Sequence, residues 1–176
     1  MSVAHVRNLV LAVYPFSQGF AFVFLEGPDS PYEWGIKEVK GKYKNTKTVD
    51  ELKKLIDRYR PEVLVIENMN GGSRRTSRIR KLYRMILHLA VAEFVDLYRY
   101  RNDEVIEYFA SVGARTKHEI ARAIALQIPA FALRMPPFRK PWMSKDSRQS
   151  LFDAVALALV FYRKIGHPDS RSPDEV

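Results

Sequence analysis

The chain has 176 residues, enough for one domain with a sizeable core, and its lack of cysteine excludes disulfides and thiolate metal sites. Its 29 Lys and Arg against 20 Asp and Glu give a formal net charge of +9, which favours a polyanionic partner over a general basic surface only if the charge is clustered. No signal peptide or membrane-spanning run is visible, and the missing thiols fit a reducing compartment, so we expect a cytoplasmic protein with no membrane partner.

Three apolar segments separated by short turns open the chain. Residues 8–14, 20–26 and 32–39 are rich in β-branched and aromatic residues, and the turns between them contain Gly and Pro. This spacing predicts three strands joined as antiparallel hairpins. The box at 48–51 (TVDE) is expected to open a helix that ends near Tyr59.

The rest of the chain alternates between strand and helix patterns. The predicted elements are a strand at Val63–Glu67, a helix over 73–99, a strand at 104–109, a helix from the capping box at 116–119 to Gln127, and a last helix over 147–164. The order predicts an α/β fold, a mixed sheet with helices on both faces, in one domain over 1–165. The polar segment 166–176, with two prolines, is expected to be a disordered tail.

Glu67 ends a short apolar run, Val63 to Ile66, in which three of four residues are β-branched. Such a run between breakers is typical of a strand buried on both faces. Ligands of open α/β sheets bind beyond the carboxyl ends of the strands. Glu67 is therefore a candidate functional residue at that edge.

Asp153 is the only charged residue in the run LFDAVALALVFY, residues 151–162. A helix this apolar should be largely buried, and a buried carboxylate must be paired, protonated or bound to a cation. One interpretation is a structural pair with an arginine or a helix cap. The other is a site in which Glu67 and Asp153 together hold Mg²⁺ or Mn²⁺ and catalyse phosphodiester hydrolysis.

Two-metal hydrolysis normally uses three or four carboxylates, so a further acid is needed. Asp146 lies two turns before Asp153, about 10 Å away along a helix, and is a candidate third catalytic acid. Its alternative role is the N-terminal cap of the last helix.

Basic residues cluster on both sides of these acids. The first cluster follows Glu67 and contains Arg74, Arg75, Arg78, Arg80, Lys81 and Arg84. The second precedes Asp153 and contains Arg134, Arg139, Lys140, Lys145 and Arg148, interleaved with Phe131, Phe138 and Trp142. The cations either form solvated faces or bind phosphates, and the aromatics either pack the loop onto the body or stack on unpaired bases.

Over residues 8–164 the chain resembles the RuvC-type Holliday junction resolvases of the RNase H-like superfamily. The element order and four short motifs carry the resemblance: Leu11-Ala12-Val13-Tyr14-Pro15 for the first strand, Val65-Ile66-Glu67 for the fourth, Val105-Ile106-Glu107-Tyr108 for the fifth, and Phe152-Asp153-Ala154-Val155-Ala156-Leu157-Ala158 for the last helix.

The resemblance implies an Asp after the first strand, a Glu after the fourth, and two acids, or an acid and a His, on the last helix. Glu67 and Asp153 match this set, whereas Tyr14 and Ser150 stand where the other acids are expected. A phenol has a pKa of about 10, is neutral at pH 7 and is a poor Mg²⁺ ligand.

Two main functions follow from this resemblance. The first is a metal-dependent endonuclease of branched DNA, weakened by the two replacements and acting as a homodimer through the apolar face of the long helix. The second is a catalytically inactive RuvC-like DNA-binding protein. A protein-interaction module would explain the fold but not the clustered charge.

Overall fold

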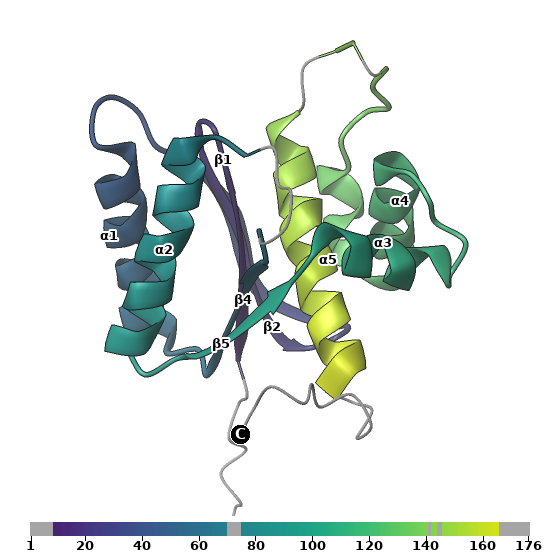
Figure 1. Ribbon diagram of the computed structural model, residues 1–176. Coiled ribbons are helices and arrows are strands. Elements are labelled where there is room, and N and C mark those ends of the chain that lie inside the picture. Colours follow the sequence, from purple (N-terminus) through teal and green to yellow (C-terminus); the bar gives the residue numbers. More distant parts are fainter. Residues whose placement is uncertain (1–8, 70–74, 141, 144–145, 166–176) are drawn as a thin grey trace, which may run out of the picture.

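The structure, a computed structural model, describes residues 9–69, 75–140, 142–143 and 146–165 and contains a five-stranded mixed sheet (Figure 1). The strands are β1 (Val10–Phe16), β2 (Gly19–Gly27), β3 (Ser30–Glu38), β4 (Val63–Glu67) and β5 (Asp96–Tyr100), in the order β3-β2-β1-β4-β5. The first three strands pair antiparallel, and β4 lies parallel to both β1 and β5. The expected hairpin strands and mixed sheet are confirmed.

Helices cover both faces of the sheet, as predicted. The helices α1 (Lys44–Tyr59) and α2 (Ser77–Ala92) lie on one side, and α3 (Asn102–Ala110), α4 (Lys117–Gln127), the 3-10 helix η1 (Pro129–Arg134) and α5 (Ser147–Ile165) lie on the other (Figure 1). Side chains of a strand alternate between faces, so Ala12 joins the core under α5 whereas Leu11 and Val13 join the core under α1 and α2.

The helix α5 packs against the middle of the sheet, and every residue from Ser150 to Phe161 is buried. This explains why its sequence is apolar almost all round, since the sheet covers one side and α3 and α4 approach the others. Within the described residues, no helix is both long and apolar enough to cross a membrane.

The predicted long helix over 73–99 and the strand over 104–109 are both wrong. The helix α2 ends at Ala92, Phe94 takes a left-handed conformation with φ 56°, and Asp96–Tyr100 forms the edge strand β5. Residues of the expected strand form α3 instead, where the Glu104 carboxylate accepts a hydrogen bond from the Arg101 backbone N–H (2.7 Å). The motif 105–108 therefore belongs to a helix.

Of the two expected capping boxes, one is wrong and one is confirmed. The helix α1 begins at Lys44, so Thr48 lies one turn inside it and is buried. At α4, the Thr116 hydroxyl accepts from the Glu119 backbone N–H and the Glu119 carboxylate accepts from the Thr116 backbone N–H, both at 3.2 Å. This box places Lys117 at the first position of α4.

The apolar face of α2 is buried within the protomer. Ile79, Leu82 and Ile86 pack in the core between α1, α2 and the sheet, so this face cannot supply the expected dimer interface. The proposed tail 166–176 and two of the proposed nucleic-acid-binding residues, Arg74 and Lys145, lie outside the described residues.

Candidate functional site

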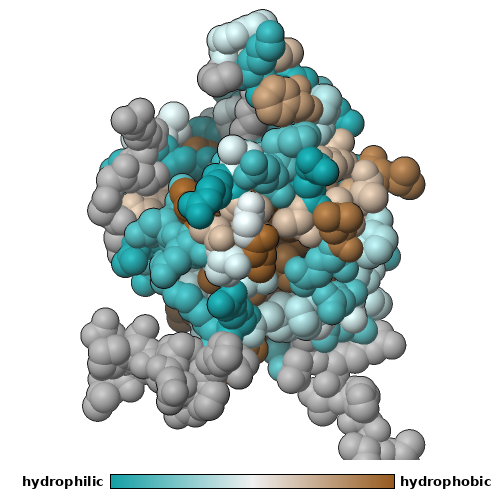
Figure 2. Space-filling model, turned by 90° about the vertical axis from the view of Figure 1, so that its right-hand side faces the viewer, coloured by the Kyte–Doolittle hydropathy of each residue, from teal (hydrophilic) through white to brown (hydrophobic). Residues whose placement is uncertain are grey.

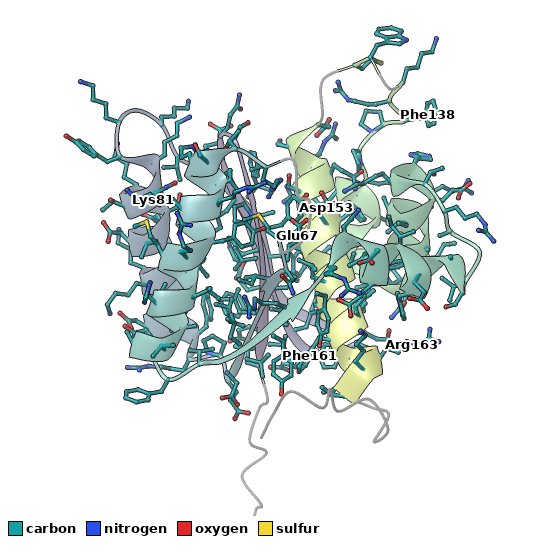
Figure 3. All side chains as sticks on the ribbon, in the orientation of Figure 1. Glu67, Lys81, Phe138, Asp153, Phe161 and Arg163 are labelled. Atoms are coloured by element: carbon teal, nitrogen blue, oxygen red, sulfur yellow. The ribbon has the colours of Figure 1, made fainter. Side chains whose placement is uncertain are left out.

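One pocket at the carboxyl ends of β1 and β4 is lined by residues from five elements: β1, β4, α3, α4 and α5. Tyr14 of β1, Glu67 of β4, Lys117 of α4 and Asp153 of α5 line a pocket of about 100 Å³. Figure 3 shows Glu67 and Asp153 near each other at this edge of the sheet. Because β1 and β4 are parallel, their last residues meet at the same edge, as the position of Glu67 in the sequence implies.

Asp153 is held by a cation from another helix. Its side chain is 8% exposed, and Oδ1 lies 2.8 Å from Nζ of Lys117 and 3.3 Å from Nε2 of Gln149. Burial of the ammonium group lowers the pKa of Lys117, but the charge and hydrogen bond of Asp153, together with Tyr14 and Glu67, outweigh burial, so the pKa is raised. The buried carboxylate is thus paired with a lysine that stays protonated at neutral pH.

Glu67 faces a second cation. Its Oε2 lies 4.0 Å from Nη2 of Arg75, and no group among the described residues hydrogen-bonds to this buried oxygen. Arg75 itself donates to the carbonyl of Pro15 and, at 3.5 Å, to the hydroxyl of Tyr14. A residue expected to bind phosphate therefore lies half-buried over β1.

Tyr14 lies between the two cations. The Arg75 guanidinium lies 4.8 Å from the centre of the Tyr14 ring, and the Lys117 ammonium lies 5.9 Å from it. Burial, and then the charge of Asp153, raise the pKa of the phenol, so Tyr14 remains neutral. The pocket is thus lined by two carboxylates, Glu67 and Asp153, and two cations, Lys117 and Arg115. Arg75 lies beside Glu67, and the tyrosine adds no charge.

This arrangement does not fit a pair of divalent ions. Two such ions need several oxygen ligands whose negative charge offsets theirs. Here each carboxylate already faces a protein cation, and a neutral phenol occupies the position of the expected first acid. Across the described ranges, no group of three Asp, Glu, His or Cys is placed to hold a metal.

Asp146 lies directly before α5, and its contacts are with Arg139 and Arg148 rather than with Glu67. It accepts a hydrogen bond from the Arg148 backbone N–H (2.9 Å) and pairs with the side chains of Arg148 (2.8 Å) and Arg139 (3.5 Å). Hydrogen bonds from Arg148 lower the pKa of Asp146 to about 2. The role these contacts support is the helix cap rather than a third catalytic acid.

Ser150, the second replaced position, is buried one turn before Asp153. It is 1% exposed, and its hydroxyl oxygen has no hydrogen-bond partner within the part of the chain that the structure describes. A carboxylate at this position would have to be accommodated in the core under the sheet.

The basic residues fall into two groups. Arg75, Arg78, Arg139 and Arg148 make bonds within the protein; Arg78, for example, contacts Asn45 Oδ1 and the Ser17 carbonyl, both at 3.1 Å. Lys81, Arg84 and Lys140 are exposed and remain available to bind an external anion.

Sequence reasoning missed Lys117, which appears there only as the second residue of a capping box. One signal could have identified it. A positive charge in the first turn of a helix opposes the helix dipole, so a lysine there suggests a compensating anion from another element.

The strand order β3-β2-β1-β4-β5, with helices on both faces, defines a mixed α/β architecture with a charged pocket at the ends of β1 and β4. Two solved structures are similar: Thermus thermophilus RuvC in complex with a Holliday junction substrate (TM-score 0.65, 18% identity) and Thermus thermophilus RuvC (TM-score 0.63, 19% identity). Each match covers 90% of this chain and 96% of the other. The chain therefore has the RuvC-type RNase H-like fold. No protein-family model and no curated protein sequence matches it.

Proposed function

We propose that this protein binds branched or otherwise structured DNA through a RuvC-like fold and cleaves it weakly or not at all. The observation that carries the proposal is the 2.8 Å contact between Lys117 and Asp153, because it places a protein cation on one of the two acids that match the family. Arg75 beside Glu67 and the neutral Tyr14 act in the same direction.

Binding to nucleic acid is supported by the distribution of charge. The net charge is +9, and α2, which follows Glu67, exposes Lys81 and Arg84. The loop before α5 adds the exposed Lys140. These cations can bind the phosphate backbone without reading the base sequence, which suits a partner defined by its shape.

A metal-dependent endonuclease is the second candidate. It is supported by the meeting of Glu67 and Asp153 in one pocket and by the buried Glu67 oxygen that lacks a hydrogen bond among the described residues. Mg²⁺ or Mn²⁺ would be its cofactor. Its activity would require Lys117 to leave Asp153.

The test is to measure binding and cleavage of a four-way DNA junction with Mg²⁺ and with Mn²⁺. We expect junction binding by the natural sequence, little or no product, and a gain of cleavage in Tyr14→Asp. Metal-dependent cleavage by the natural sequence that disappears in Glu67→Gln would favour the second candidate. Robust cleavage that survives Glu67→Gln would contradict the site assignment, and failure to bind any DNA would contradict the proposal.

We also propose that the protein acts as a homodimer, since a four-way junction presents two equivalent strands to a pair of identical subunits. The interface must lie outside the buried face of α2. Sedimentation velocity, with and without junction DNA, measures this directly.

A further inference from the structure

The segment between η1 and α5 stands out from the body on the side of the candidate site. Figure 1 shows this segment rising beyond the N-terminal end of α5, and Figure 2 shows it standing clear of the rest of the surface. Asp153 lies six residues into α5, about 9 Å along the helix from its first residue. We call the described part of this segment, residues 135–140 and 142–143, the aromatic loop.

Two large aromatic side chains of the aromatic loop are exposed to solvent. Phe138 is 68% exposed and Trp142 is 77% exposed. Phe131, which the sequence groups with them, is instead fully buried and packs edge-on against Trp34, with ring centres 5.1 Å apart. Packing onto the body therefore accounts for Phe131, whereas it leaves most of the surface of Phe138 and Trp142 in solvent.

The aromatic loop is held at its base rather than at its tip. Pro136 is buried, and the ring of Phe138 lies edge-on to His118, with ring centres 5.3 Å apart. His118 directly follows Lys117, so this contact ties the loop to the first turn of α4 beside the pocket. At the other end, Asp146 pairs with Arg139 of the loop and Arg148 of α5.

The tip combines an aromatic surface with positive charge. The Met143 backbone N–H donates to the Lys140 carbonyl at 3.0 Å, which makes a tight turn that presents Trp142. The ammonium group of Lys140 lies 5.6 Å from the centre of the Trp142 ring. Exposed rings beside cations are the features that proteins use to stack unpaired bases while holding the adjacent phosphates.

We propose that Trp142 and Phe138 form a stacking platform for unpaired nucleobases, which directs the protein to DNA with single-stranded or unstacked positions. This inference rests on the proposed function and gives it a substrate class. A base on the platform would place the attached backbone on the side of the pocket, because Phe138 packs against His118, the residue that follows Lys117 in α4.

The experiment uses the full chain with Trp34→Phe, so that Trp142 is the remaining tryptophan of the two in the sequence. Its fluorescence is followed during titration with a duplex containing a single-stranded gap and with a fully paired duplex of equal length. We expect quenching by the gapped duplex and little by the paired one. Trp142→Ala and Phe138→Ala should weaken binding to the gapped duplex by roughly five- to a hundredfold and leave binding to the paired duplex within about twofold.

The matched control is Leu126→Ala, which removes a side chain that is 81% exposed on α4 and should change neither affinity. The stacking platform is overturned if the Trp142→Ala, Phe138→Ala double variant binds the gapped duplex as tightly as the natural sequence and the gapped duplex does not quench Trp142 fluorescence. This result would leave the proposed function intact. Binding to neither DNA overturns both. Loss of self-association in Trp142→Ala, with DNA binding unchanged, would instead assign the loop to an interface between two copies.

Discussion

The ammonium nitrogen of Lys117 lies 2.8 Å from Oδ1 of Asp153, in the pocket that Glu67 also lines. A lysine from α4 thus supplies the positive charge that a buried carboxylate requires. The side chain of Lys117 is 56% exposed along its length, whereas that of Asp153 is 8% exposed, so the carboxylate depends on the pair more than the lysine does. Removal of the lysine should therefore produce a measurable loss of stability.

Lys117→Met should lower the free energy of unfolding by about 1–3 kcal/mol, because Asp153 is left buried without a counter-ion. Asp153→Asn in the same background should recover part of the loss, since a neutral amide needs no counter-ion. Urea unfolding of the two single variants and the double variant gives the coupling energy. The control is Lys81→Met on the exposed side of α2, for which the change should stay within about 0.5 kcal/mol. Equal stability of Lys117→Met and the natural protein would show that the pair is unimportant.

The natural protein should not bind Mn²⁺ in its pocket below millimolar concentration, because both carboxylates face protein cations and Tyr14 is neutral. Tyr14→Asp adds a third carboxylate beside them and should bind Mn²⁺ measurably by electron paramagnetic resonance. Tyr14→Phe, which removes the hydroxyl without adding charge, is the control. Micromolar Mn²⁺ binding by the natural protein, abolished by Glu67→Gln, would refute the description of the pocket.

Removal of the Asp146 charge should reduce stability at neutral pH and flatten its acid dependence. The pKa of Asp146 falls from 3.8 to about 2 on folding, so its contribution is complete above pH 3.8 and is lost as the pH falls through about 2. Asp146→Ala should cost about 1–2 kcal/mol, since it removes both the helix cap and the pairs with two partly exposed arginines.

Asp146→Asn separates these two effects, because the amide oxygen can still accept from the Arg148 backbone N–H. It should cost less than Asp146→Ala and show the same loss of acid dependence. Urea unfolding at several values of pH measures both quantities. If the stability of all three proteins fell in parallel on acidification, Asp146 would not be the titrating group.

Among the cations of α2, we expect Lys81 and Arg84 to bind DNA and Arg78 to stabilise the fold. Lys81→Ala and Arg84→Ala should weaken DNA binding and each reduce the slope of log affinity against log salt by about 1, with stability unchanged, because both side chains are exposed. Arg78→Ala should instead lower stability by about 1 kcal/mol, since Arg78 bonds to Asn45 and Ser17.

Arg58→Ala is the control for these variants. Arg58 is exposed in the last turn of α1, at the end of that helix opposite its Asn45 contact with Arg78. It should leave the salt slope unchanged. An equal effect of Arg58→Ala and Lys81→Ala would mean that the whole basic surface, and not α2, binds DNA.

Local sequence patterns predicted an element correctly where its composition alone requires that it be buried. The apolar, β-branched run before Glu67 favours a strand with both faces covered, and β4 is such a strand. The apolar residues around Asp153 favour burial of the whole helix, and α5 lies in the core. Periodicity failed near Val91 and Phe94, where helical spacing continues past the true end of α2. Residues 96–100 become a strand because Val65 and Glu67 offer a parallel ladder to Tyr98 and Tyr100, a long-range pairing with no local signal.

The amino-acid sequence alone indicates the mixed sheet, Glu67 at the end of β4 and the buried Asp153 on α5. Each of these follows from the hydrophobic pattern of a short segment. Only the folded chain decides which cations these acids meet. Lys117 and Asp153 are 36 positions apart, and Arg75 reaches Tyr14 across 61. Contacts over such separations depend on how the helices pack on the sheet, and that packing converts a set of acids that resembles a metal centre into one neutralised by the protein itself.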